Sequence, residues 1–258
     1  MRPCMKQPFS VRGIEYGGAR PLFCVPLVAD DLERLLPQAA VAHHAAADLV
    51  EWRADSYKDL TPAGLIDCLS RLRSLLASEP IIFTLRIRRE GGAQDISQEI
   101  RRTCIESVAA CGLADMVDIE LCNETPFLES VIRVAHEHKV RVVLSYHNFD
   151  ETPVREDLLT KIDMMYRHGA DVAKIAVMPL GAADVLRLLE ITLEARQRFP
   201  QLALCTTSMG RLGTLSRVAG FLFGSDMAYA VVCETSAPGQ IPIREARSIT
   251  EKLFGCDD

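Results

Sequence analysis

Short runs with β-strand character recur along the chain at intervals of about 30 residues, the size of one strand–helix unit. Runs of this kind are typical of strands that are buried on both faces of a parallel sheet. No other feature restricts the fold as strongly, because few architectures repeat one strand and one helix so many times. The eight runs occupy residues 21–28, 47–55, 80–86, 116–121, 141–147, 171–179, 201–209 and 227–234.

The segments between these runs carry helical patterns. Residues 62–78 and 184–199 place apolar side chains at positions i, i+3, i+4 and i+7, as on one face of a helix. Alternating strands and helices predict a parallel sheet, and eight such units predict a closed (β/α)₈ TIM barrel in the α/β class. Residues that favour helix ends agree with this pattern: Thr61, Pro62 and Asp95 at starts, and Gly112 and Gly169 at ends.

Residues 8–18 precede the first barrel strand and predict a small β-hairpin. We expect this hairpin, within an N-terminal extension over residues 1–20, to lie across the bottom of the barrel. A doubly wound open sheet is the alternative, but no G-x-G-x-x-G motif follows the first strand. The sequence therefore favours one barrel domain over residues 1–258.

Composition and charge exclude several classes of protein. Of the 258 residues, 48% are hydrophobic and 25% are charged, which fits a globular protein with a large core. The formal net charge is −6 and no basic stripe is present, which argues against nucleic-acid binding. No apolar run reaches the roughly 18 residues of a membrane-spanning helix, and residues 1–10 lack the apolar centre of a signal peptide.

The nine cysteines are scattered along the chain without a C-x-x-C pair. Their odd number and their spacing indicate neither a disulfide framework nor a zinc knuckle. We therefore expect reduced thiols and a cytoplasmic location. An anionic ligand would have to be bound by a few placed arginines, because the overall charge is negative.

Polar side chains gather where several predicted strands end, which the barrel interpretation requires of an active site. After the third strand, the residues REGG form a loop that carries Glu90 and two glycines, which we expect to be flexible. Any one of these residues could be a solvated loop position, but their shared location favours a site. The strand-end residues are Glu51, Trp52, Arg53, Thr84, Arg86, Asp118, Glu120, Ser145, Tyr146 and His147.

Lys174 lies in the middle of the apolar run DVAKIAVMP. On an edge strand its side chain could reach water, but a closed barrel has no edge strand. Inside a barrel the ammonium group must be paired with a carboxylate or lose its solvation. Desolvation and nearby arginines would lower the pKa of the amine, and a neutral amine is a nucleophile that forms Schiff bases with carbonyl compounds.

His147 ends the strand next to that of Lys174 and is the natural proton-transfer partner, because imidazole both accepts and donates a proton near neutral pH. A metal site is the alternative, since Glu51, Glu120 and His147 could ligate a divalent ion. In such a site Lys174 would lie beside the metal without a role, and three protein ligands are few for a divalent ion.

Several motifs resemble those of the type I 3-dehydroquinate dehydratases over nearly the whole chain. They occur in the same order and spacing, and the pair KIAVMP and SAPGQ, about 60 residues apart in this chain, is the most specific. The motifs are LVEWRAD, FTLR with REGG, SYHNF, AKIAVMP, SMGRLGTLSRVAG and SAPGQIP. Two departures are Asn148, where many relatives carry Asp, and Thr207, where some carry Met.

The resemblance implies a (β/α)₈ homodimer that dehydrates 3-dehydroquinate to 3-dehydroshikimate in the shikimate pathway, without a metal or an organic cofactor. By resemblance, Lys174 forms an imine with the substrate ketone, His147 is the general acid and base, and Glu90 orients His147. Arg217 matches the arginine that binds the substrate carboxylate. The remaining matches are Glu51, Arg53 and Arg86 as polar substrate contacts, and Ser236 and Gln240 in a loop that closes over the substrate.

Two other functions stay open at this point. A class I aldolase also uses a lysine imine in a barrel, but it cleaves a carbon–carbon bond and commonly binds a phosphate. A barrel that only binds a shikimate-type carboxylate is the second alternative, although a pure binding protein has no need of a reactive amine.

Overall fold

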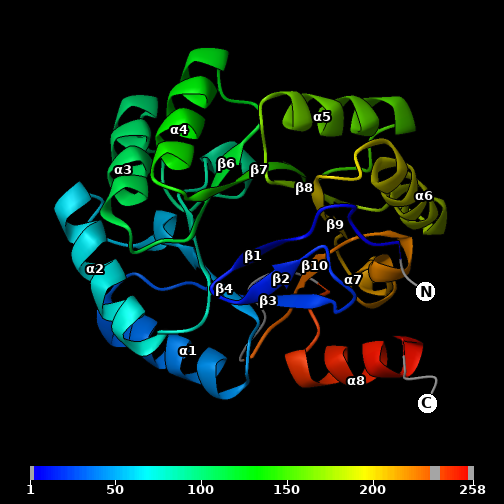
Figure 1. Ribbon diagram of the computed structural model, residues 1–258, viewed down its shortest axis with the longest axis horizontal. Helices are drawn as coiled ribbons and strands as arrows, with labels where there is room; N and C mark the ends of the chain where they lie inside the picture. The colour runs from blue at the N-terminus through cyan, green and yellow to red at the C-terminus, as the bar shows by residue number, and fades with distance from the viewer. Residues whose placement is uncertain (1–2, 233–238, 255–258) are drawn as a thin grey trace.

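The strands expected from the sequence form one parallel sheet in the computed structural model, which describes residues 3–232 and 239–254. Their order is β10-β3-β4-β5-β6-β7-β8-β9, and the sheet curls almost into a closed barrel (Figure 1). The predicted barrel fold is confirmed, and the open-sheet alternative is wrong. The strands are β3 (Leu22–Leu27), β4 (Leu49–Arg53), β5 (Ile81–Thr84), β6 (Met116–Glu120), β7 (Arg141–Asn148), β8 (Val172–Val177), β9 (Ala203–Ser208) and β10 (Met227–Tyr229).

The first and last strands of this order meet without a regular ladder between β9 and β10. Residues just before β10 bridge the gap instead. The backbone N–H of Asp226 donates to the carbonyl of Leu204 at 2.7 Å, and the Asp226 carboxylate accepts from the N–H of Leu204 at 2.8 Å. A side chain thus replaces part of the missing ladder, and the backbone groups at the seam keep their hydrogen bonds.

Helices surround the sheet on its outer side, as Figure 1 shows. Thr61 caps α2 by accepting from the N–H of Gly64 at 3.1 Å, and Gly112 ends α3 with a left-handed backbone. The start expected at Asp95 is wrong, because Ser97 accepts from the N–H of Ile100 and so begins α3 two residues later. The helices are α1 (Leu32–His44), α2 (Pro62–Leu75), α3 (Gln98–Cys111), α4 (Thr125–Glu137), α5 (Arg155–Arg167), α6 (Ala182–Arg198), α7 (Thr214–Ala219) and α8 (Ile243–Phe254).

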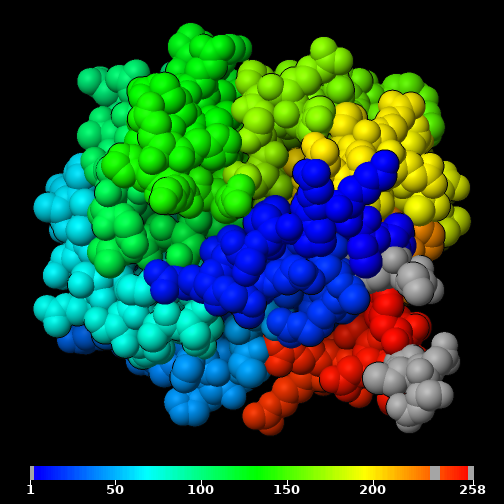
Figure 2. All heavy atoms as spheres, in the orientation of Figure 1, coloured from blue at the N-terminus to red at the C-terminus, as the bar shows by residue number. Residues whose placement is uncertain are grey.

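The N-terminal hairpin of β1 (Phe9–Val11) and β2 (Ile14–Tyr16) closes the bottom of the barrel, as predicted. Val11 and Tyr16 pack on side chains that fill the lower interior, and the Tyr16 hydroxyl donates to Met116 Sδ at 3.3 Å. Figure 2 shows the N-terminal residues in blue lying across the centre of this face. The interior is therefore covered at this end.

Side chains alternate between the two faces of each barrel strand, as the period of a strand requires. On β8, Ala173, Ile175 and Val177 belong to the core under the helices, whereas Val172 belongs to the lower interior of the barrel. Lys174 shares the face of Val172 and therefore points inward. Within the described ranges, no helix is both long enough and apolar enough to cross a membrane.

Candidate active site

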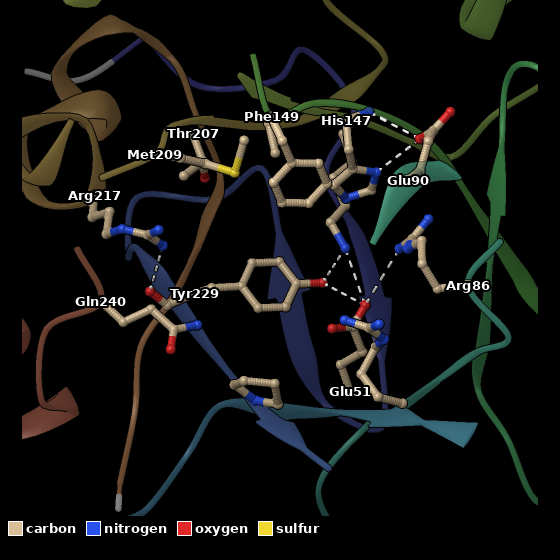
Figure 3. A pocket seen from close by; sticks show the side chains of 14 residues that line it. Glu51, Arg86, Glu90, His147, Phe149, Thr207, Met209, Arg217, Tyr229 and Gln240 are labelled. Carbon is tan, nitrogen blue, oxygen red and sulfur yellow. Dashed lines mark hydrogen bonds and ion pairs between the residues drawn. The ribbon is translucent and has the colours of Figure 1, made fainter. Parts of the chain in front are cut away.

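A pocket opens at the carboxyl ends of the barrel strands, where the barrel interpretation places an active site. It holds about 660 Å³ of empty space, with the open solvent at its mouth included, and combines charged side chains with an apolar wall (Figure 3). Most of the residues that sequence reasoning singled out line it. The lining residues are Pro26, Glu51, Arg53, Arg86, Glu90, His147, Phe149, Lys174, Ala176, Thr207, Met209, Arg217, Tyr229 and Gln240.

Lys174 reaches the pocket from the barrel interior, and its side chain is only 7% exposed. Its ammonium group donates to Glu51 Oε1 at 3.0 Å, to Asp118 Oδ2 at 2.9 Å and to the Tyr229 hydroxyl at 2.8 Å. Burial lowers the pKa of Lys174, but the two carboxylates outweigh burial and raise it above its ordinary value. The expectation of a depressed pKa is therefore wrong, because the two hydrogen-bonded acids outweigh both burial and Arg86.

A buried network of charges surrounds the Lys174 site on the side of β5 and β6. Arg86 pairs with Asp118 at 2.8 Å and with Glu120 at 3.0 Å, and it also donates to Ser145 Oγ at 2.6 Å. Glu120 binds a second cation, Arg101, on its other oxygen. The pKa of Asp118 lies far below its usual range despite burial, because Arg86 and Lys174 both stabilise its charge. Each buried charge in this network thus has a partner, as burial requires.

His147 is held by Glu90, as the resemblance implied. One oxygen of Glu90 accepts from the backbone N–H of His147 at 2.9 Å and lies 3.0 Å from its Nδ1. A carboxylate accepts hydrogen bonds, so the neutral ring carries its proton on Nδ1 and leaves the Nε2 lone pair available. Burial, then Arg86 and Lys174, lower the pKa of His147 well below its usual value, so the ring is neutral at pH 7.

The loop that carries Glu90 is closely packed at its two glycines, whose flexibility stays a prediction. Gly91 has a left-handed backbone (φ +88°), and a Cβ there would lie 2.8 Å from the ring of Phe149. A Cβ on Gly92 would lie 2.2 Å from the carbonyl oxygen of Arg86. Both positions disfavour a side chain, and the Phe149 ring that Gly91 approaches is stacked with His147 at a centroid distance of 6.4 Å.

Arg217, on α7, is the cation least satisfied by the protein among these pocket residues. Its Nη1 donates to the backbone carbonyl of Tyr229 at 3.2 Å, while its buried Nε has no hydrogen-bond partner among the residues that the structure describes. Burial lowers its pKa to about 10, so it remains charged at neutral pH. The buried hydroxyl of Thr207, which lines the same pocket, also lacks a partner within the described part of the chain. Unpaired buried donors are costly, so this wall suits an anionic or hydroxylated ligand.

Arg53 differs from Arg217, because its Nε and Nη2 both have hydrogen-bond partners. It pairs with both oxygens of Asp55 at 2.8 Å and donates to the carbonyl of Gly91. Arg53 thus ties strand β4 to the Glu90 loop while it lines the pocket. Gln240 lines the pocket below Arg217 (Figure 3), and Ser236 lies outside the described residues.

The residues weighed as a metal site do not converge. Glu120 is bound by Arg86 and Arg101, and His147 directs Nδ1 to Glu90. Over residues 3–232 and 239–254, no group of three or more His, Cys, Asp or Glu side chains is placed to hold a metal ion.

Sequence reasoning did not assign a role to several residues at this site. Asp118 was noted only as a strand-end acid, yet it pairs directly with Lys174. Tyr229, which contacts the same amine, was missed, although the two-residue period of the run MAYAVV places Met227 and Tyr229 on one face. Phe149 and Met209 also line the pocket and were missed, although the two-residue period places Phe149 on the face of His147 and Met209 on the face of Thr207.

Comparison with known proteins agrees with this geometry. The profile of the type I 3-dehydroquinase family matches residues 23–256. A 3-dehydroquinate dehydratase of Bacillus licheniformis is 41% identical over 250 residues, which cover 96% of this chain and 98% of the relative. The chain is also similar to the crystal structure of 3-dehydroquinate dehydratase from Geobacillus kaustophilus, with a TM-score of 0.96, 38% identity and full coverage of both chains.

A further similar structure is the type I 3-dehydroquinate dehydratase of Clostridium difficile with covalently modified comenic acid. The TM-score is 0.94 at 34% identity, and the match covers 97% of this chain and 99% of the other. Together with the family match and the barrel, these similarities identify the chain: it belongs to the type I 3-dehydroquinase family.

Proposed function

We propose that Lys174, His147 and Glu90 carry out the dehydration of 3-dehydroquinate to 3-dehydroshikimate in this chain. The activity, that of a hydro-lyase of the Schiff-base class, follows from membership of the family. The assignment of steps to individual residues is the proposal. The observation that supports it most directly is a primary amine buried in the barrel, lining the same pocket as a neutral imidazole.

The reaction begins when the amine of Lys174 adds to the C3 ketone of the substrate and water leaves, which gives an imine. The protonated imine withdraws electrons from the adjacent C2–H bond. Nε2 of His147 accepts the C2 proton, the electrons form the C1–C2 double bond, and the C1 hydroxyl departs as water after protonation. Hydrolysis of the imine then restores the amine of Lys174 and releases the enone product.

Glu90 orients this proton transfer, because its contact with Nδ1 of His147 fixes the tautomer that leaves Nε2 basic. We propose that Arg217 binds the substrate carboxylate, since its unpaired Nε and its charge suit a carboxylate. Glu51, Arg53 and Arg86 are the proposed contacts to the ring hydroxyls. Ser236 and Gln240 are proposed to close over the bound substrate and exclude water.

Borohydride reduction tests the imine. With 3-dehydroquinate present, reduction should add a substrate-derived mass to the peptide that contains Lys174. Peptides with Lys161, whose ammonium group lies on the ring of Tyr146 at 4.2 Å, serve as the internal control and should stay unmodified. An unmodified Lys174 in a sample that remains active would overturn the proposal.

Product analysis separates this function from its alternatives. A dehydratase produces a conjugated enone that absorbs in the ultraviolet, whereas an aldolase releases two smaller fragments from its substrate. A barrel that only binds a carboxylate would show no turnover. A homodimer, a cytoplasmic location and a single domain over residues 1–258 complete the proposal, and size-exclusion chromatography with light scattering would test the dimer.

A further inference from the structure

One residue that sequence reasoning missed touches both ends of the proposed substrate site. The hydroxyl of Tyr229 accepts a hydrogen bond from the ammonium group of Lys174 at 2.8 Å. The backbone carbonyl of the same residue accepts from Nη1 of Arg217 at 3.2 Å. Figure 3 shows the Tyr229 ring extending from the side of Arg217 toward Glu51. The last residue of β10 thus positions the amine and the arginine relative to each other.

The Tyr229 hydroxyl also forms a closed triangle with Lys174 and Glu51. It donates its single hydrogen to Glu51 Oε1 at 3.1 Å, and Lys174 donates to the same oxygen at 3.0 Å. Burial and then Glu51 raise the pKa of Tyr229 well above its usual value, so the hydroxyl keeps its hydrogen at neutral pH. The triangle therefore offers a hydroxyl that can accept one proton while it donates another.

The amine cannot attack a ketone in its present state, because an ammonium group has no lone pair and all three hydrogens are donated. Asp118 is a poor acceptor for the proton, because Arg86 lies 2.8 Å from it and stabilises its negative charge. Arg86 lies 3.9 Å from Glu51, so the charge of Glu51 is less strongly paired. Glu51 is the carboxylate that can receive the proton of Lys174.

The direction in which the proton leaves decides where the new lone pair points. Direct transfer to Glu51 leaves the lone pair facing a carboxylate. Transfer through Tyr229 leaves it facing the Tyr229 hydroxyl, which belongs to the residue that also contacts Arg217 through its backbone carbonyl. A substrate whose carboxylate binds Arg217 would lie beside this residue, so the second route directs the amine toward the substrate and not toward a carboxylate.

We propose that Tyr229 is a catalytic residue whose hydroxyl relays a proton from Lys174 to Glu51 before the imine forms. In this step the N–H bond of Lys174 breaks and a new O–H bond forms on Tyr229. At the same time the original O–H bond of Tyr229 breaks and Glu51 becomes protonated. The products are a neutral amine, an unchanged tyrosine and a neutral carboxylic acid, so no net charge is created in the buried site. This inference rests on the proposed role of Lys174.

The test compares Tyr229→Phe with the wild type and with Tyr16→Phe. Tyr229→Phe keeps the ring and the backbone carbonyl that binds Arg217, and it removes only the hydroxyl. Tyr16→Phe makes the same chemical change at the covered end of the same barrel. The readout is the rate at which Lys174 becomes trapped by borohydride after rapid mixing with saturating 3-dehydroquinate. We expect Tyr229→Phe to slow trapping on the order of 10- to 100-fold, with substrate affinity and melting temperature near those of Tyr16→Phe.

A double-mutant cycle with Glu51→Gln separates a relay from a loss of packing. If both residues serve one proton path, the double variant should trap substrate about as slowly as the slower single variant. Trapping by Tyr229→Phe at the wild-type rate, or multiplied effects in the double variant, would overturn the relay. Absence of any adduct on Lys174 in the wild type would instead reject the proposed function, so the two failures are distinguishable.

Discussion

The lower and upper halves of the barrel interior have opposite chemistry on the same strands. Moving up by two residues on five successive strands replaces an apolar inward side chain with a polar or charged one. Lower residues pack with the N-terminal hairpin, whereas upper residues hold the charge network and line the pocket. The pairs are Leu49 and Glu51, Ile82 and Thr84, Met116 and Asp118, Val143 and Ser145, and Val172 and Lys174.

This difference separates stability from chemistry within one barrel. The lower half gains free energy by burying apolar surface under the hairpin. The upper half desolvates charges, which costs free energy that pairing only partly returns. The same burial sets the charge states that catalysis needs. It keeps His147 neutral, and it leaves Arg217 with a donor that has no partner among the described residues.

The largest effect on activity is expected from Lys174→Met, which gives the upper half a side chain typical of the lower half. Turnover should fall on the order of 10⁴-fold or more, because no imine can form. The free energy of unfolding should also fall, by about 3–5 kcal/mol, since Glu51 and Asp118 lose a counter-charge. Steady-state kinetics and urea denaturation measure the two effects. Turnover within tenfold of the wild type would contradict the assignment.

The converse change, Val172→Lys, places an ammonium group in the lower half. Its neighbours there are apolar, so we expect the free energy of unfolding to fall by at least about 4 kcal/mol. Val172→Met is the matched control for side-chain length and should cost about 1–3 kcal/mol by overpacking. Urea denaturation of both variants provides the comparison. Equal stabilities would mean that the lower half tolerates charge as the upper half does.

Arg217→Lys keeps a positive charge at this position in the upper half but removes the guanidinium group, which can donate two hydrogen bonds to one carboxylate. We expect kcat/KM to fall about 10- to 100-fold, mainly through a higher KM. Arg211→Lys, at an exposed position six residues earlier in the chain, is the matched control and should behave as the wild type. A change in kcat alone would place Arg217 in the chemical step and not in binding.

The pH profile tests the electrostatics of the upper half without any substitution. His147 has a pKa well below 6.5, so its base form persists as the pH falls, and no acid inflection is expected near pH 6.5. The raised pKa of Lys174 would make kcat/KM rise about tenfold per pH unit if its proton had to reach water. Transfer of that proton to Glu51 predicts a flat profile between about pH 6.5 and 8.5. A steep rise would show that the proton leaves the site.

The smallest effects belong to Tyr16→Phe in the lower half. The Tyr16 hydroxyl donates only to a thioether, a weak acceptor, so stability should change by no more than about 1 kcal/mol. Catalytic rates should stay within about twofold of the wild type. A large loss of activity would mean that the hairpin end of the barrel affects the pocket.

Periodicity in the sequence is sufficient to determine the fold of this chain. Strand-like runs spaced at one strand–helix unit, with an apolar hairpin before them, specify a parallel barrel because each strand must be buried on both faces. The position of Lys174 within such a run also placed its amine inside. The strand-end rule brought His147, Arg86 and Glu51 to the same mouth, and the structure places all of them there.

Tertiary structure alone decided the state of those groups. The contact of Lys174 with Glu51 spans 123 residues of sequence, and that with Tyr229 spans 55. Coulomb energies depend on distances of a few ångströms across the barrel, which neither composition nor periodicity encodes. For that reason the sequence indicated a reactive amine, but only the folded barrel shows that it rests as a paired ammonium group and that Tyr229 contacts both this group and Arg217.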